Sequence, residues 1–163
     1  MKANDRFRAA SQALDFYPDI QYFPEGTRTA ADAANAVGCS IGQIVKSLVF
    51  AADEQPVLLL VSGSNRVDEK LVENFLNATS LSIAAPDEVK EATGFAIGGT
   101  PPFGHNQQIQ TIMDSDLNQY DQVWAAAGTP DSCFPISPTE LCKIANATVA
   151  DLEAQLVAAQ EAC

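Results

Sequence analysis

The sequence has few of the residues on which metal sites and nucleophilic enzymes depend. It contains one histidine, His105, and four widely spaced cysteines that form no C-x-x-C pair. Zinc sites need clustered cysteine and histidine ligands, so no metal site is expected. The G-x-G-x-x-G and G-x-x-x-x-G-K-[ST] phosphate loops and the G-x-S-x-G nucleophile elbow are also missing. These absences argue against a cofactor-dependent enzyme, a metal hydrolase and a serine hydrolase.

Long apolar segments are missing as well. No stretch reaches the roughly 18 consecutive apolar residues that indicate a membrane-spanning helix. The first residues include Asp5, Arg6 and Arg8 and lack the apolar core of a signal peptide. We therefore expect a cytoplasmic protein without a membrane partner, whose cysteines are free thiols that serve as small apolar fillers.

Positive charge is scarce. Nine basic residues stand against 21 acidic ones, and the net charge is −12. Such a chain cannot bind phosphate backbones through its overall field, so DNA is not expected as a partner. Four of the basic residues, Arg28, Lys46, Arg66 and Lys70, fall in one stretch. Any phosphate recognition would therefore be local and would involve few contacts.

The length of 163 residues and an apolar share of 47% suit a single domain spanning residues 1–163. Periodicity and capping residues predict helices at 4–14, 29–37, 67–76, from 86, from 137 and at about 148–159. Strands are predicted at 20–23, 44–52, 56–62, 81–84, 109–113, 122–127 and 133–136. Short turns join several neighbouring strands. We therefore expect an α+β fold with a mixed, strongly curved sheet or partial β-barrel of about six to seven strands, flanked by helices.

Lys46 is unusual within the predicted strand at 44–52. Side chains alternate across a strand, so Lys46 shares a face with Ile44, Leu48 and Phe50. An ammonium is costly to bury unless it is paired. The local pattern alone leaves two interpretations open: a functional lysine, or a structural one with its head in solvent. Ser47 alternates to the opposite face, which weakens a direct role for it.

The segment from Thr93 to His105 predicts a shaped loop, since it holds four glycines and two prolines. Glycine allows positive φ and proline fixes φ. Asp114 is expected to cap a short turn after its strand, and Gly128 belongs to a turn before the last predicted strand.

These motifs, in this order, resemble the YbaK/prolyl-tRNA-synthetase-associated domain family over roughly residues 22–152. The resemblance rests on Thr29 to Ala34, Gly38-Cys39, Ile44 to Phe50, Arg66 to Asp68 and Thr93 to Gly104, with Asp114, Gly128 and Ser137-Pro138 following. Members are similar to the editing insertion of bacterial prolyl-tRNA synthetase and to free-standing proteins that hydrolyse mischarged aminoacyl-tRNA. The family's required lysine falls on Lys46, and its G-x-x-x-P loop falls on Gly98 to Pro102.

The resemblance therefore implies a trans-acting aminoacyl-tRNA deacylase without a cofactor, which removes a small amino acid from proline tRNA. Its partners would be the aminoacylated 3′ end of tRNA and prolyl-tRNA synthetase. Lys46 is the catalytic candidate. The substrate-binding candidates are Gly98, Gly99, Thr100, Pro101, Pro102, Gly104, His105, Asp114, Gly128 and Arg28.

Two alternatives stay open. One is a non-catalytic module that binds an aminoacylated or nucleotide-like end and regulates a synthetase, which the acidic charge favours. The other is hydrolysis of a different small acyl ester. The amino acid, the tRNA, the oligomeric state and the need for a synthetase do not follow from the sequence.

Overall fold

The computed structural model describes residues 1–27 and 29–152, which form five α-helices, two 3-10 helices and eight strands. The α-helices are α1 (Ala3–Ala13), α2 (Ala30–Val37), α3 (Glu69–Leu76), α4 (Pro86–Thr93) and α5 (Pro138–Ala145). The strands are β1 (Gln21–Tyr22), β2 (Val45–Ala52), β3 (Gln55–Ser62), β4 (Leu81–Ile83), β5 (Gln110–Asp114), β6 (Val123–Ala126), β7 (Ser132–Ile136) and β8 (Thr148–Ala150). The 3-10 helices are η1 (Ile41–Gln43) and η2 (Ser115–Gln119).

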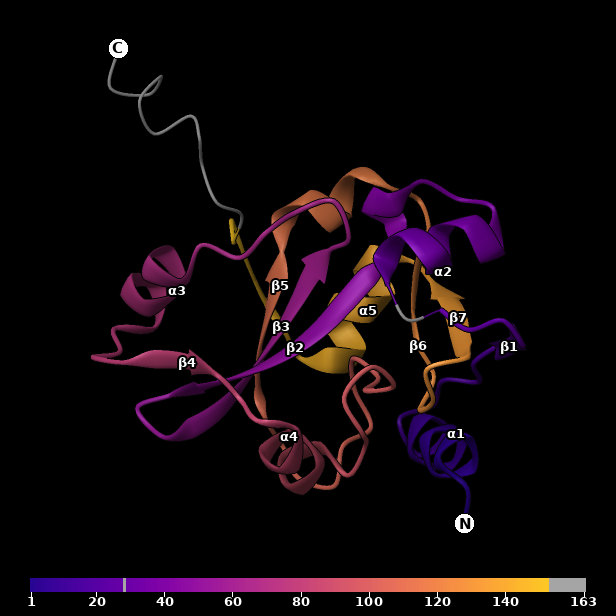
Figure 1. Ribbon diagram of the computed structural model, residues 1–163, viewed down its shortest axis with the longest axis horizontal. Helices are drawn as coiled ribbons and strands as arrows, with labels where there is room; N and C mark the ends of the chain where they lie inside the picture. Colours follow the sequence, from indigo (N-terminus) through magenta and orange to yellow (C-terminus); the bar gives the residue numbers. More distant parts are fainter. Residues whose placement is uncertain (28, 153–163) are drawn as a thin grey trace.

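The strands form two sheets that lie beside one another (Figure 1). The larger has the order β4-β2-β3-β5-β8, and the smaller has the order β1-β7-β6. In the larger sheet β3–β5 and β5–β8 are parallel while the other pairs are antiparallel. A parallel bridge between Ile44 and Trp124 links the two sheets. The expected mixed α+β fold is confirmed, and its eight strands lie in two sheets that do not close into a barrel.

Two apolar clusters cover the two faces of the larger sheet. One fills the space between the sheets and includes Phe7, Phe103 and Phe134, whose ring centroids lie 5.0–5.9 Å apart. The other packs against Val72 of α3. Alternation along β2 sends Val49 to the first cluster and Phe50 to the second, as expected for a strand buried on both faces.

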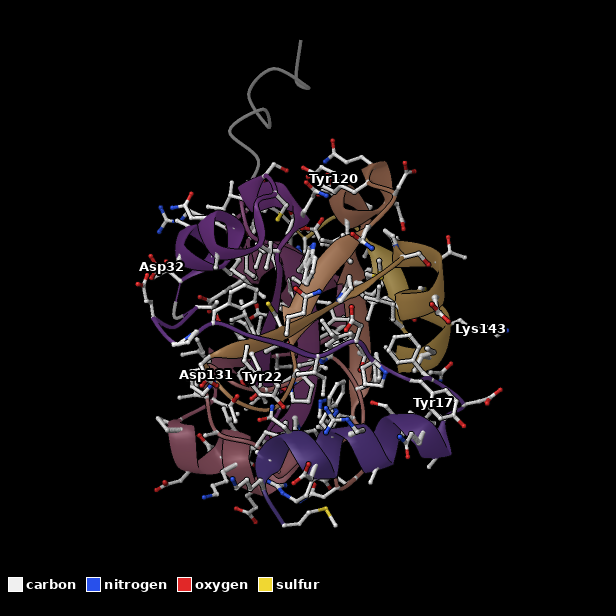
Figure 2. The ribbon with its side chains drawn as sticks, turned by 90° about the vertical axis from the view of Figure 1, so that its right-hand side faces the viewer. Tyr17, Tyr22, Asp32, Tyr120, Asp131 and Lys143 are labelled. Carbon is white, nitrogen blue, oxygen red and sulfur yellow. The ribbon has the colours of Figure 1, made fainter. Side chains whose placement is uncertain are left out.

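The turn between β6 and β7 is hydrogen-bonded to two segments near the N-terminus of the chain. Tyr22 and Asp131 lie close together there (Figure 2), and the N–H of Phe23 donates to the carbonyl of Asp131. From the other side, the Asn4 side chain donates to the Ala127 carbonyl at 2.8 Å and to Ser132 Oγ at 2.9 Å. Helix α1 therefore fixes the position of this turn.

Most predicted boundaries are confirmed by the capping geometry. Thr29 accepts a hydrogen bond from the Asp32 N–H, Gly38 ends α2 with a φ of 78°, and Ser137 caps α5. The helix expected at 148–159 is wrong at its start, where Thr148–Ala150 forms β8. The open edge of β5 there offers a partner that outweighs helical spacing. The rest of that prediction, residues 153–159, lies outside the described residues.

None of the helices within residues 1–27 and 29–152 is both long enough and apolar enough to cross a membrane.

Candidate active site

Lys46 projects from β2 on the face that also carries Val61 and Asp114. Lys46 lies opposite Val61 in the β2–β3 pair. The β3–β5 pairing ends at Leu60 and Met113, and the next residues on these two strands are Val61 and Asp114. The half-buried Lys46 ammonium donates to the main-chain carbonyl of Asn65. No carboxylate in the described part of the chain lies within ion-pair distance of Lys46. Its head is thus anchored by a neutral acceptor and keeps donors for a ligand.

Asn65 links this anchor to a buried carboxylate. Its Nδ2 donates to Asp114 Oδ2 at 2.9 Å and to Asp116 Oδ2 at 2.8 Å. The fully buried Asp114 also accepts from the Ser62 N–H at 3.0 Å and, through Oδ1, from the Asp116 N–H. Asp114 therefore caps η2, as predicted, and also fixes the loop that holds Lys46. Sequence reasoning missed Asn65, because its role depends on a side chain reaching 49 residues along the chain.

The electrostatic surroundings of Lys46 disfavour its charged form. Burial lowers the pKa of the Lys46 ammonium from the usual 10.5, while the Asp114 carboxylate raises it and the exposed Arg66 lowers it. The Coulomb attraction of Asp114 thus offsets part of the desolvation. A partly desolvated cation gains more from an approaching anion than a fully hydrated one does.

A cavity of about 310 Å³ opens beside β2, between the two sheets. Consecutive residues Val45 to Leu48 form one wall, and Trp124 to Ala126 of β6 form the opposite wall. Helix α2 supplies Ala30 and Ala33, and β7 supplies Ser132 and Cys133. Burial raises the pKa of the Cys133 thiol to about 12, so that it is a neutral apolar filler at pH 7.

The glycine-proline loop closes one side of this cavity through Ile97, Gly98 and Thr100. Gly98 has a φ of 88°, a conformation that glycine adopts without strain. Gly99 packs directly on the β6–β7 turn: a Cβ there would lie 2.9 Å from the Gly128 carbonyl oxygen and 2.8 Å from Thr129 Cα. The loop and the turn thus touch main chain to main chain.

A hydrogen bond within the glycine-proline loop fixes the C-terminal end of that loop. The Nε2–H of His105 donates to the Pro101 carbonyl at 2.7 Å, since a carbonyl can only accept. Burial lowers the pKa of His105 below its usual 6.5. Pro101 and Pro102 are buried, and Gly104 has a φ of 81° and packs against Ala10 of α1.

The structure brings some of the predicted residues together and separates others. Lys46, Gly98 and Thr100 line the cavity. The other predicted loop residues are not in the cavity lining, namely Gly99, Pro101, Pro102, Gly104 and His105. Gly128 packs against the loop at Gly99, and Asp114 supports Lys46 through Asn65. Arg28 lies outside the described residues. The contributions of these residues to binding stay predictions.

The chemistry available in the cavity is that of a cation, hydroxyls and main-chain amides. Within residues 1–27 and 29–152, no three His, Cys, Asp or Glu side chains gather into a potential metal site. The Thr100 hydroxyl donates to the Ala96 carbonyl, which leaves it as an acceptor. A reaction here would depend on positioning and electrostatic stabilisation.

Comparisons with known proteins agree on one family. A model of the aminoacyl-tRNA editing domain matches residues 24–144. The uncharacterized protein YwhH of Bacillus subtilis is 30% identical over 132 residues, covering 80% of this chain and 83% of that protein. A proline--tRNA ligase of Levilactobacillus brevis is 30% identical over 106 residues, covering 65% of this chain and 18% of the ligase. A crystal structure of a proposed trans-editing enzyme for prolyl tRNA synthetase has a TM-score of 0.90 and 44% identity, covering 95% of this chain and 99% of that one.

Proposed function

This chain belongs to the aminoacyl-tRNA editing domain family, and from that premise we propose that it is a trans-acting deacylase that hydrolyses the ester of mischarged aminoacyl-tRNA. The observation that carries the proposal is the half-buried ammonium of Lys46, anchored at the wall of the cavity between the sheets. A lysine at this position costs stability through desolvation. A substrate anion would offset that cost.

Lys46 is proposed to bind the terminal phosphate or the ester oxygens of the tRNA 3′ end. Its carbonyl anchor on Asn65 keeps the cation in one place without neutralising it. Electrostatic stabilisation in an active site depends on such fixed placement. The exposed Arg66 raises the local positive potential close to Lys46, in a chain that is otherwise strongly acidic.

The proposed reaction is hydrolysis with the substrate's own groups assisting. Water forms a bond to the ester carbonyl carbon, and negative charge develops on the carbonyl oxygen. The bond between that carbon and the ribose oxygen then breaks. The ribose oxygen takes one proton from the attacking water, the second proton passes to solvent, and the amino acid leaves with a free carboxylate. The main chain of Gly98, which lines the cavity, is available to contact the ester.

The substrate class is proposed from the cavity and the relatives. A volume of about 310 Å³ lies at the low end of ligand pockets, which favours a small aminoacyl group. One relative reported above is a proline--tRNA ligase, and one similar structure is described as a proposed trans-editing enzyme for prolyl tRNA synthetase. Proline tRNA carrying a small amino acid is therefore the first substrate to test.

The test is a single-turnover deacylation assay with alanyl-tRNA and prolyl-tRNA, both made on proline tRNA. We expect release of alanine, and a loss of about 100-fold or more for Lys46→Ala, in line with the loss of one fixed electrostatic contact. Lys70→Ala removes an exposed cation from α3 and is the matched control, with an unchanged rate expected.

Two results would contradict the proposal. One is a folded Lys46→Ala variant with full activity. The other is Lys46-dependent, salt-sensitive tRNA binding without turnover at any aminoacyl ester in a panel of mischarged tRNAs. That second result would favour the non-catalytic module, an alternative consistent with the net charge of −12.

A further inference from the structure

The main-chain edge of β2 is open where the strand lines the cavity. Strand β4 pairs with β2 only at Phe50 to Ala52, and the bridge to the neighbouring strand β6 is made by Ile44, just before β2 begins. Between these points no strand in the described part of the chain is paired with the edge, and β6 faces it across the cavity. Residues 46–48 are accordingly half-buried in a strand that is otherwise mostly buried.

Ser47 is the residue whose main-chain groups point out of this edge. The Val49 carbonyl accepts from the Ala84 N–H on the β4 side, whereas the Ile44 carbonyl accepts from the Gly63 N–H on the β3 side. Main-chain groups alternate between the two sides of a strand. The N–H and C=O of Ser47, two residues before Val49, therefore point toward the cavity.

The environment of the Ser47 side chain also indicates that the main chain of Ser47, and not its hydroxyl, is available to a ligand. Its Oγ is buried and is without a hydrogen-bond partner among the described residues. Ser47 as a whole is nevertheless partly exposed and lines the cavity. The surface that it shows to a ligand is therefore its main chain and Cβ, and an unpaired strand edge is a ready template for another extended segment.

We propose that the aminoacyl group docks on Ser47 as a single residue of an antiparallel strand. An aminoacyl ester carries an amino group and a carbonyl on one Cα, as a strand residue does. In a hydrogen-bonded antiparallel pair, two opposed residues exchange both N–H···O bonds. The Ser47 N–H donates to the ester carbonyl oxygen, and the Ser47 carbonyl accepts from the α-ammonium.

The direction of pairing fits the position of Lys46. The two chains of an antiparallel pair run in opposite directions. The atoms that follow the docked aminoacyl residue therefore lie opposite Lys46, the residue before Ser47. The ester oxygen and ribose therefore come to lie beside Lys46. The amino-acid side chain shares the face of Ser47 and points away from the cation. A parallel alignment would instead direct the ribose toward the apolar Leu48.

This inference rests on the proposed deacylase function and adds a consequence for catalysis. The Ser47 N–H would meet the oxygen on which negative charge develops, as one donor of an oxyanion hole. Recognition through the main chain is independent of the substrate side chain, so the size of the cavity would decide which amino acids enter.

A direct test observes the Ser47 amide in the free and bound protein. The probe is 3′-(alanylamino)-3′-deoxyadenosine, whose amide is not hydrolysed. We expect amide hydrogen exchange at Ser47 to slow by about tenfold or more at saturation, because hydrogen bonding protects amides. The Lys46 N–H points into the β2–β3 ladder and is the internal control. The propionylamino analogue, which lacks the amine, should bind about tenfold more weakly, as for a lost charge-assisted hydrogen bond.

A second test removes the Ser47 N–H by replacing the peptide bond between Lys46 and Ser47 with an ester through chemical ligation. The ester also weakens the Lys46 carbonyl as an acceptor in the β2–β3 ladder, so urea unfolding must show that the variant is folded under the assay conditions. We expect kcat/KM of the folded variant to fall by about 100-fold.

The two proposals can fail separately. A wild-type rate in the ester variant, or an unprotected Ser47 amide at saturation, would overturn the docking mode while Lys46→Ala remains inactive. An absence of deacylation by the wild-type chain would overturn both.

Discussion

Asn65→Ala tests whether Lys46 is held in place by a polar network, in which the Asn65 side chain donates to Asp114 and Asp116. The substitution removes two hydrogen bonds to carboxylates, to Asp114 at 2.9 Å and to Asp116 at 2.8 Å. Hydrogen bonds to charged groups contribute about 1.5–3 kcal/mol each, and Asp116 is only partly buried, which places its bond at the low end. We expect the free energy of unfolding to fall by about 3–4.5 kcal/mol.

The same substitution should reduce activity by a different route. The Asn65 carbonyl that accepts from Lys46 remains, but the side chain that holds its loop on Asp114 is gone. A displacement of about 1 Å in a catalytic group can cost up to 100-fold in rate. We expect a 10- to 100-fold loss of kcat/KM in a variant that is fully folded at the assay temperature.

Urea unfolding and single-turnover deacylation measure the two effects, and a double-mutant cycle with Lys46→Ala separates them. If Asn65 acts through Lys46, the activity losses should be far from additive. Gln119→Ala removes one exposed hydrogen bond to the Asp116 carbonyl and is the control, with less than about 0.5 kcal/mol expected. Additive activity losses, or a stability loss as small as that of the control, would refute the role of the network.

Three further outcomes follow from the supporting residues. Gly99→Ala should destabilise the fold by about 1–3 kcal/mol in thermal unfolding, because the new Cβ meets the Gly128 carbonyl oxygen at 2.9 Å. The pKa of His105 is lowered by burial, so protonation favours the unfolded chain: stability should fall as the pH drops through about 6.5. His105→Gln keeps a donor for the Pro101 carbonyl and should weaken that pH dependence in urea titrations. Ser47→Ala should raise the unfolding free energy by up to about 1 kcal/mol, because it removes a buried hydroxyl that has no hydrogen-bond partner among the described residues. A clear loss of stability would show that the hydroxyl is bonded.

The elements of the fold could be predicted because their determinants are local. Thr29, Gly38 and Ser137 bound their helices through side-chain caps or positive φ, which depend on a few neighbouring residues. The β2–β3 hairpin follows in the same way from two apolar runs with a short turn between them. The end of the chain was predicted incorrectly because β8 depends on β5, some 36 residues earlier.

The site could be predicted only as far as single residues stand out. Lys46 was conspicuous as a charge among apolar neighbours, and the glycines near Gly98 as unusual local composition. Asn65 carries no such mark, since an asparagine after a glycine-serine turn is ordinary. Its place between Asp114 and Lys46 depends on the parallel pairing of β3 with β5.

Ser47 shows a more general limit of strand patterns. Alternation assigns Lys46 and Ser47 to opposite faces of β2, which argued against a shared site. A strand also has two edges, however, and the sequence does not tell which stretch of an edge lacks a neighbour. Here neither β4 nor β6 pairs with residues 46–48, whose edge faces the cavity. A ligand that is hydrogen-bonded along this open edge can contact the Ser47 main chain, which points out of the edge. The same ligand can reach the Lys46 side chain, which projects from one face of the strand. Consecutive residues on opposite faces then serve one site, and the open edge joins them.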